Sequence, residues 1–115
     1  MNPIKTFIGT ITNMPGLYLH ILLTEEDDVI VARCLDFSVS SHGENKEEAL
    51  ASLNDSIANY LDYALKQGAF EAIIDPEEDM FWDIFKEQQL KEETAAIADY
   101  VNILKLKDIP EINYA

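Results

Sequence analysis

The sequence predicts a single α+β domain: a small antiparallel sheet with one long helix across a face and an additional C-terminal helix. Three observations predict this class. Short strand-like runs fill the first 40 residues, and a capped amphipathic helix follows them. The length of 115 residues suggests one domain, and a hydrophobic content of 48% is enough for a core.

The first expected strands form a hairpin. Residues 6–12 are rich in β-branched side chains, and the Pro-Gly pair at 15–16 suits the centre of a type II turn. Two apolar runs of strand length, 17–23 and 29–35, flank the acidic tract 24–28. This pattern predicts two antiparallel strands joined by a charged loop.

A last short strand leads into a clearly marked helix start. Residues 37–40 alternate apolar and polar after a very tight connection around Asp36, as a strand with one solvent-exposed face does. Gly43 can adopt a positive φ, which would let the chain leave the strand. Asn45 is a good N-cap, and Glu48 three residues later gives a motif similar to a capping box.

The helix that begins at this cap should lie across the sheet. Lys66 falls in its last turn and Gly68 ends it, as expected near the C-terminus of a helix. Its apolar residues form one stripe at helical spacing. They are Leu50, Leu53, Ile57, Tyr60, Leu61 and Ala64.

A second helix start is predicted at Asp75, with Pro76 in the first helical position and Glu78 closing a capping box. Residues 88–98 continue this helix or form another, and both alternatives stay open. Residues 99–107 alternate in a way that suits a late strand. We therefore expect a core at about 6–70 and a C-terminal helical extension at about 75–107.

The net charge is the most informative feature of the composition. Eight basic residues face 22 acidic ones, for a formal net charge of −14, and the basic residues are scattered. Direct nucleic-acid binding is disfavoured, because it usually needs a basic patch. An acidic surface would attract basic partners, or it only keeps the protein soluble.

Compartment signals agree with a cytoplasmic protein. The first ten residues lack the long apolar stretch of a signal peptide, and no segment is apolar for long enough to span a membrane. Cys34 is the one cysteine, which excludes an internal disulfide framework.

The sequence contains no strong catalytic, cofactor-binding or metal-binding motif. His20 is expected on a sheet face without partners for a metal or base role. His42 lies at a strand-to-helix junction, as a turn residue or a binding residue. Cys34 is expected to be a small buried hydrophobe rather than a reactive thiol.

Two groups of residues, four carboxylates and the aromatic side chains of the second helix, have either a structural or a functional role. A two-metal nuclease site built from Asp27, Asp28, Asp36 and Glu48 is disfavoured, because Glu48 caps a helix and the aspartate pair lies in a hairpin loop. The aromatic side chains of the second helix pack on the domain, on a dimer mate or on a partner. Since a small domain buries a modest fraction of its surface, we expect a homodimer or higher symmetric oligomer.

Three short segments, 31–36, 40–43 and 47–50, read VARCLD, SSHG and EEAL, and their order and spacing resemble the HicB-like antitoxin core over about residues 17–68. The structural motif residues are Gly43, Asn45, Glu48 and Ala49. The candidate partner-binding residues are Asp36, His42, Phe81, Trp82 and Phe85.

The resemblance implies a β-β-β-α core with a later strand, described as a partial RNase H fold. It implies an antitoxin-type binding role without enzymatic activity, and a partner that is a small basic RNase toxin of double-stranded-RNA-binding-domain shape, whose catalytic histidine the antitoxin covers. The chain after Gly68 is acidic and has no basic recognition helix, so operator DNA binding is disfavoured. The alternative is a stand-alone HicB-like protein acting as an oligomeric protein- or RNA-binding module. A short basic reading frame beside the gene would distinguish the two.

Overall fold

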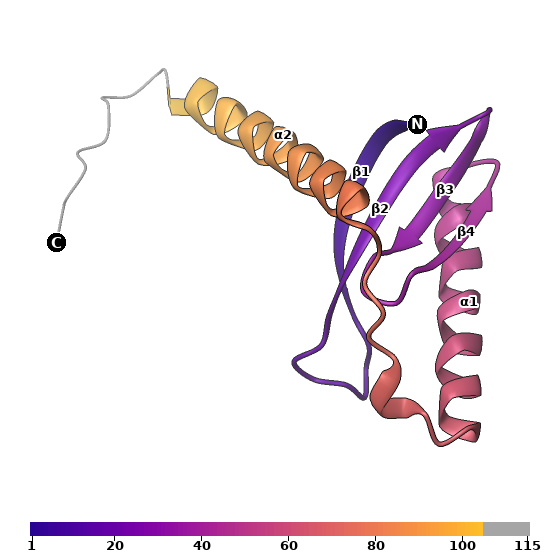
Figure 1. Ribbon diagram of the computed structural model, residues 1–115. Coiled ribbons are helices and arrows are strands. Elements are labelled where there is room, and N and C mark those ends of the chain that lie inside the picture. Colours follow the sequence, from indigo (N-terminus) through magenta and orange to yellow (C-terminus); the bar gives the residue numbers. More distant parts are fainter. Residues whose placement is uncertain (105–115) are drawn as a thin grey trace, which may run out of the picture.

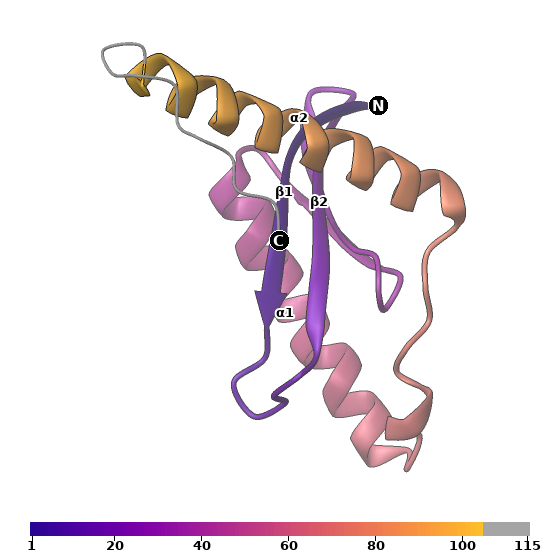
Figure 2. The same ribbon diagram turned by 90° about the vertical axis from the view of Figure 1, so that its left-hand side faces the viewer.

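The computed structural model describes the chain from residue 1 to residue 104 and the side chains of residues 1–99. Its elements, in chain order, are β1 (Asn2–Thr10), β2 (Tyr18–Glu26), β3 (Val29–Cys34), β4 (Val39–Gly43), α1 (Lys46–Lys66), the 3₁₀ turn η1 (Phe70–Ala72) and α2 (Asp79–Leu104). The four strands form one sheet in the order β1-β2-β3-β4, and all neighbours are antiparallel. Helix α1 lies along one face, and α2 crosses β1 and β2 on the other (Figures 1 and 2). The predicted α+β class with an antiparallel sheet is confirmed.

The order of elements differs from the β-β-β-α-β expectation. Four strands precede α1, and within residues 1–104 no strand follows it. The late strand expected at 99–107 is wrong for residues 99–104, which form the last turns of α2, and its remainder lies outside the described residues. Alanine has the highest helix propensity, and three alanines occur just before this segment, at positions 95, 96 and 98. They favour continuation of the helix over a short strand. The first strand also begins earlier than predicted, at Asn2.

The hairpin is confirmed. Asp27 and Asp28 make the turn between β2 and β3 with φ values of 49° and 68°. Two central residues with positive φ are typical of a type I′ turn, whose twist matches that of the flanking strands. Aspartate adopts a positive φ more readily than most residues, so the two aspartates of the acidic loop favour formation of this turn.

The cap of α1 is confirmed as well. The Asn45 side-chain oxygen accepts a hydrogen bond of 2.8 Å from the Glu48 backbone N–H. The helix ends before Gly68, which has a φ of 65°. Gly43, however, is not among the glycines with positive φ in the described chain. A Cβ at Gly43 would lie 2.5 Å from the Ala49 backbone nitrogen, so glycine is needed there for close approach to α1 and not for its φ.

The second helix begins at Asp79 and not at Asp75. The backbone N–H groups of Asp75 and Glu77 donate to the carbonyls of Asp36 and Leu35, at 2.9 and 2.8 Å. These tertiary hydrogen bonds hold the segment against the β3–β4 connection, so the capping box predicted from the local sequence does not form.

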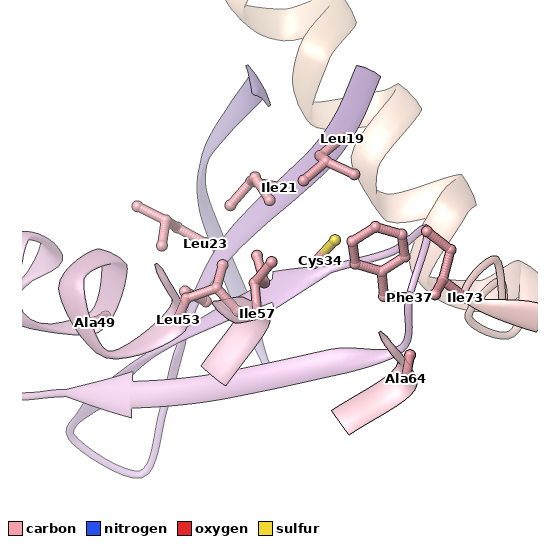
Figure 3. Close-up of a cluster of buried hydrophobic side chains, with 11 residues drawn as sticks. Leu19, Ile21, Leu23, Cys34, Phe37, Ala49, Leu53, Ile57, Ala64 and Ile73 are labelled. Atoms are coloured by element: carbon pink, nitrogen blue, oxygen red, sulfur yellow. The ribbon is translucent and has the colours of Figure 1, made fainter. Parts of the chain in front are cut away.

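Strand β2 supplies a core on both faces of the sheet, because successive side chains of a strand point to opposite sides. Leu19, Ile21 and Leu23 face α1, together with Cys34 and other buried side chains (Figure 3). The expected stripe of α1 fits this core, with Leu53, Ile57 and Ala64 buried and Leu50, Tyr60 and Leu61 packed at its margin. On the opposite face, Leu22, Leu35 and Phe85 form a smaller core beneath α2.

Candidate functional site

A histidine–aspartate pair lies on the sheet face beneath α2. The His20 backbone N–H donates to Asp36 Oδ1 at 2.6 Å, and the ring Nδ1 lies 3.0 Å from Asp36 Oδ2. The two residues are 16 positions apart, and the fold brings them together because the β3–β4 connection returns beside β2. Sequence reasoning missed this pair. The signal that could have found it is a polar residue inside an apolar strand combined with a carboxylate in a tight connection.

Two aromatic side chains of α2 cover the His20 ring. The ring centroid of Trp82 lies 5.1 Å from that of His20 in a tilted arrangement, and Phe85 lies edge-on at 5.4 Å. Aromatic contacts at these separations are favourable and directional. The His20–Asp36 pair therefore helps fix where α2 sits on the sheet.

A group of side chains around Arg33, which we call the arginine cluster, lies on the same face as the His20–Asp36 pair. Arg33 is on this face because it is the register partner of Leu22. Arg33 donates from Nη1 to Glu26 Oε2 at 2.8 Å and to Thr24 Oγ1 at 3.0 Å. Its guanidinium carbon lies 4.7 Å from the centroid of the Phe81 ring, a cation–π contact. The hydrogen bonds from Arg33 hold the pKa of Glu26 below its usual value.

Two groups lie close to Asp36, the His20 ring and, from the core on the α1 side of the sheet, the Cys34 thiol. Within residues 1–99, Asp36 is the only hydrogen-bond partner of the His20 ring. Cys34 lies 4.0 Å from Asp36 through its Sγ, but the thiol is fully buried and burial raises its pKa to about 11. A thiol in that state is protonated at neutral pH and is a poor nucleophile. The prediction that Cys34 acts as a small buried hydrophobe is confirmed.

The four carboxylates considered for a two-metal site are spread over the molecule. Asp27 and Asp28 form the tip of the β2–β3 hairpin, Asp36 lies beyond the opposite end of β3, and Glu48 is in the first turn of α1. Among the described residues, no group of three or more His, Cys, Asp or Glu side chains could hold a metal ion.

The candidate partner-binding residues divide into two groups. Asp36, Phe81, Trp82 and Phe85 meet beneath α2, whereas His42 is exposed on the edge strand β4. Phe85 is only 2% exposed and packs on Leu22 and Leu35. The hypothesis that this aromatic cluster forms a partner-binding surface is wrong for Phe85, because its side chain is buried between α2 and the sheet.

The segment between α1 and the first turns of α2 is rich in carboxylates, and we call residues 71–83 the acidic strap. Its acidic residues are Glu71, Asp75, Glu77, Glu78, Asp79 and Asp83, and no basic residue occurs from position 67 to position 85. All except Glu77 are exposed. The Ser38 hydroxyl donates to the Asp75 carbonyl at 2.5 Å, in addition to the two backbone bonds to Asp36 and Leu35. The sequence had indicated only a helix start here.

A groove of about 390 Å³ lies between the C-terminal part of β1 and α1. Gly9, Leu19, Ile57 and Leu61 are among its lining residues, and none of the lining residues is charged. The groove therefore offers apolar surface but no group suited to acid–base chemistry.

None of the protein-family models, curated proteins or solved structures compared with this chain matches it. In the part of the chain that the structure describes, no helix is both long enough and apolar enough to cross a membrane. The resemblance to HicB-like antitoxins stays a prediction from three short motifs.

Proposed function

We propose that this protein is a non-catalytic, antitoxin-type binding protein that sequesters a small basic protein. The acidic strap carries the proposal, because five of its six carboxylate residues are exposed and it contains no basic residue. A small basic RNase toxin is the partner class that the sequence resemblance implies.

The strap is a preorganised surface rather than a loose acidic tail. Three hydrogen bonds, donated by Ser38, Asp75 and Glu77, fix the backbone in the middle of the strap at residues 75–77. A surface that is already ordered loses less conformational entropy when it binds. Complementary charge raises the association rate of a basic partner and disfavours acidic competitors.

The polar groups of the sheet face beneath α2 are used within the fold, which favours binding over catalysis. His20 pairs with Asp36, and Arg33 pairs with Glu26 and Thr24. In the described residues, every buried side-chain nitrogen or oxygen has a hydrogen-bond partner. No buried polar side chain of the described residues is therefore left unpaired and available to bind a substrate.

The experiment measures binding of this chain to the product of a short basic reading frame beside its gene, by stopped-flow association at low and moderate salt. The strap variant combines Glu71→Gln, Glu78→Gln and Asp83→Asn. The matched control combines Glu25→Gln, Glu44→Gln and Asp55→Asn, which removes the same charge from exposed positions elsewhere.

The strap variant should lower the association rate constant at least about tenfold at low salt, with a smaller effect at moderate salt. The control should change it much less. Equal effects of the two variants would mean that overall charge, and not the strap, attracts the partner. A chain that does not bind the neighbouring product, or has no such neighbour, would overturn the antitoxin proposal.

A second candidate is an oligomeric binding module without a toxin. One observation favours it: the C-terminal half of α2 extends past the sheet (Figure 1), and Ile97 in that half is exposed. The binding experiment separates the two candidates, since only the first requires the basic partner.

A further inference from the structure

Strand β1 forms one edge of the sheet in the described chain, and its sequence is well suited to pair with another strand. Residues 6–12, which start within β1, read TFIGTIT, with no charge and no proline. Uncharged segments rich in β-branched residues are prone to pair with another chain when they lie on an open edge. Pro3, Lys5 and the irregular register between them disfavour such pairing only at the start of the strand.

Two polar side chains of α2 bind the outer edge of β1, where the helix crosses the strand (Figure 2). Gln88 Nε2 donates to the Ile4 carbonyl at 3.3 Å, and Glu92 Oε1 accepts from the Thr6 backbone N–H at 3.1 Å. These backbone groups belong to residues two positions apart, which is the spacing of groups that point away from the neighbouring strand β2. Gln88 and Glu92 are about one helical turn apart, so both reach the same edge. The helix thus takes hydrogen bonds that a further strand would make.

The Glu92 carboxylate is held firmly at this edge. Its Oε2 accepts from the Thr6 hydroxyl, and its Oε1 also lies 2.9 Å from the Lys5 ammonium. Burial opposes ionisation, but hydrogen bonds from Thr6 and Lys5 outweigh it and hold the pKa of Glu92 below its usual value. Hydrogen bonds to an ionised acceptor are stronger than those between neutral groups. Phe85, buried in the second core, fixes the preceding turns of the helix.

We infer that α2 is an edge guard: through Gln88 and Glu92 it keeps the β1 edge closed to strand addition by a second copy of this chain. A second strand that paired along β1 would need the two backbone groups that α2 already binds. Beyond them, the alternation of β1 leaves only Ile8 and Thr10 at the outer edge, too few for a stable strand pair. The first 24 residues contain no acidic residue, so two β1 edges could meet without repulsion between carboxylates.

Amide hydrogen exchange at Thr6, measured by NMR, and sedimentation equilibrium of the full chain test this inference. The test variant combines Gln88→Ala and Glu92→Ala. The matched control combines Gln89→Ala and Glu93→Ala, which removes the same residue types at the same spacing, about 100° further round the helix axis. Glu92→Ala alone, with Glu93→Ala as its control, replaces the double variants if far-UV circular dichroism shows that these do not keep the wild-type fold.

In the test variant, the Thr6 amide should exchange at least about tenfold faster than in wild type, because a hydrogen bond to a charged acceptor is lost. The variant should also gain a concentration-dependent association that wild type and control lack, and moderate salt should strengthen it by screening the repulsion between acidic copies. Unchanged exchange at Thr6 would overturn the inference. So would faster exchange without new association, or equal association of the test variant and the control. The measurement needs no other protein, so its outcome is independent of the antitoxin proposal.

Discussion

Gly43 offers the sharpest test of how the sheet and α1 fit together. It ends β4, and a Cβ built on it would lie 2.5 Å from the Ala49 backbone nitrogen and 2.8 Å from the Glu48 carbonyl carbon. Real Cβ atoms do not approach backbone this closely, so Gly43→Ala must push β4 away from the first turn of α1. That turn cannot yield freely, because the Ala49 N–H donates to the Asn45 carbonyl at 3.0 Å.

The size of the effect follows from these contacts. Overpacking a well-packed site costs about 1–3 kcal/mol, and the clash at Gly43 is with main chain rather than with a side chain that could rotate. We therefore expect Gly43→Ala to lower the free energy of unfolding by about 3 kcal/mol. For a domain of this size, such a change lowers Tm by roughly 10 °C.

Urea denaturation followed by far-UV circular dichroism measures this loss, and Gly9→Ala is the control. A Cβ at Gly9 would lie 3.9 Å from the Leu19 Cβ, which is an ordinary contact. Gly9→Ala should therefore change stability by less than about 0.5 kcal/mol, or raise it slightly, because alanine has less conformational freedom in the unfolded chain. If Gly43→Ala stayed within about 1 kcal/mol of wild type, the close packing of β4 against α1 would be refuted.

Three further predictions follow from the cap, the second core and the arginine cluster. Asn45→Ala should lower the free energy of unfolding by about 1 kcal/mol, and Asn45→Asp should lower it much less; an unchanged urea midpoint for the alanine variant would show that Asn45 is not the cap. Phe85→Ala should cost about 3–5 kcal/mol and shift the fluorescence of Trp82 to longer wavelength, because α2 loses its buried anchor; an unshifted spectrum would contradict this role. Because hydrogen bonds from Arg33 lower the folded-state pKa of Glu26 below 4.5, its contribution to stability is present above that pH and is lost as the pH falls through the folded-state pKa. Glu26→Gln should therefore flatten the dependence of unfolding free energy on pH below about 4.5, whereas Glu25→Gln at the exposed neighbouring position should not; equal slopes for the two variants would remove the Arg33–Glu26 pair from the acid response.

Elements with local signals could be predicted from the amino-acid sequence alone. The β2–β3 hairpin was readable because its two apolar runs flank a turn of Asp27 and Asp28. The boundaries of α1 could be predicted because the Asn45 side chain accepts a hydrogen bond from the Glu48 N–H, three residues away, and because Gly68 ends the helix. The apolar stripe of α1 also showed which face would be buried. Each of these interactions joins residues within a few positions, so the local sequence is sufficient to specify them.

Features that depend on residues far apart in the chain could not be predicted in this way and became visible only in the folded protein. Asp75 has a good capping sequence after it, yet α2 starts at Asp79, because backbone bonds to the β3–β4 connection compete with the helix. The pairing of His20 with Asp36 and the burial of Phe85 on Leu22 arise because β2 presents alternate residues to two covered faces. Periodicity showed that α2 has apolar residues, but not which surface they would meet. That choice is set by contacts between segments far apart in the chain, whose relative positions only the folded sheet provides.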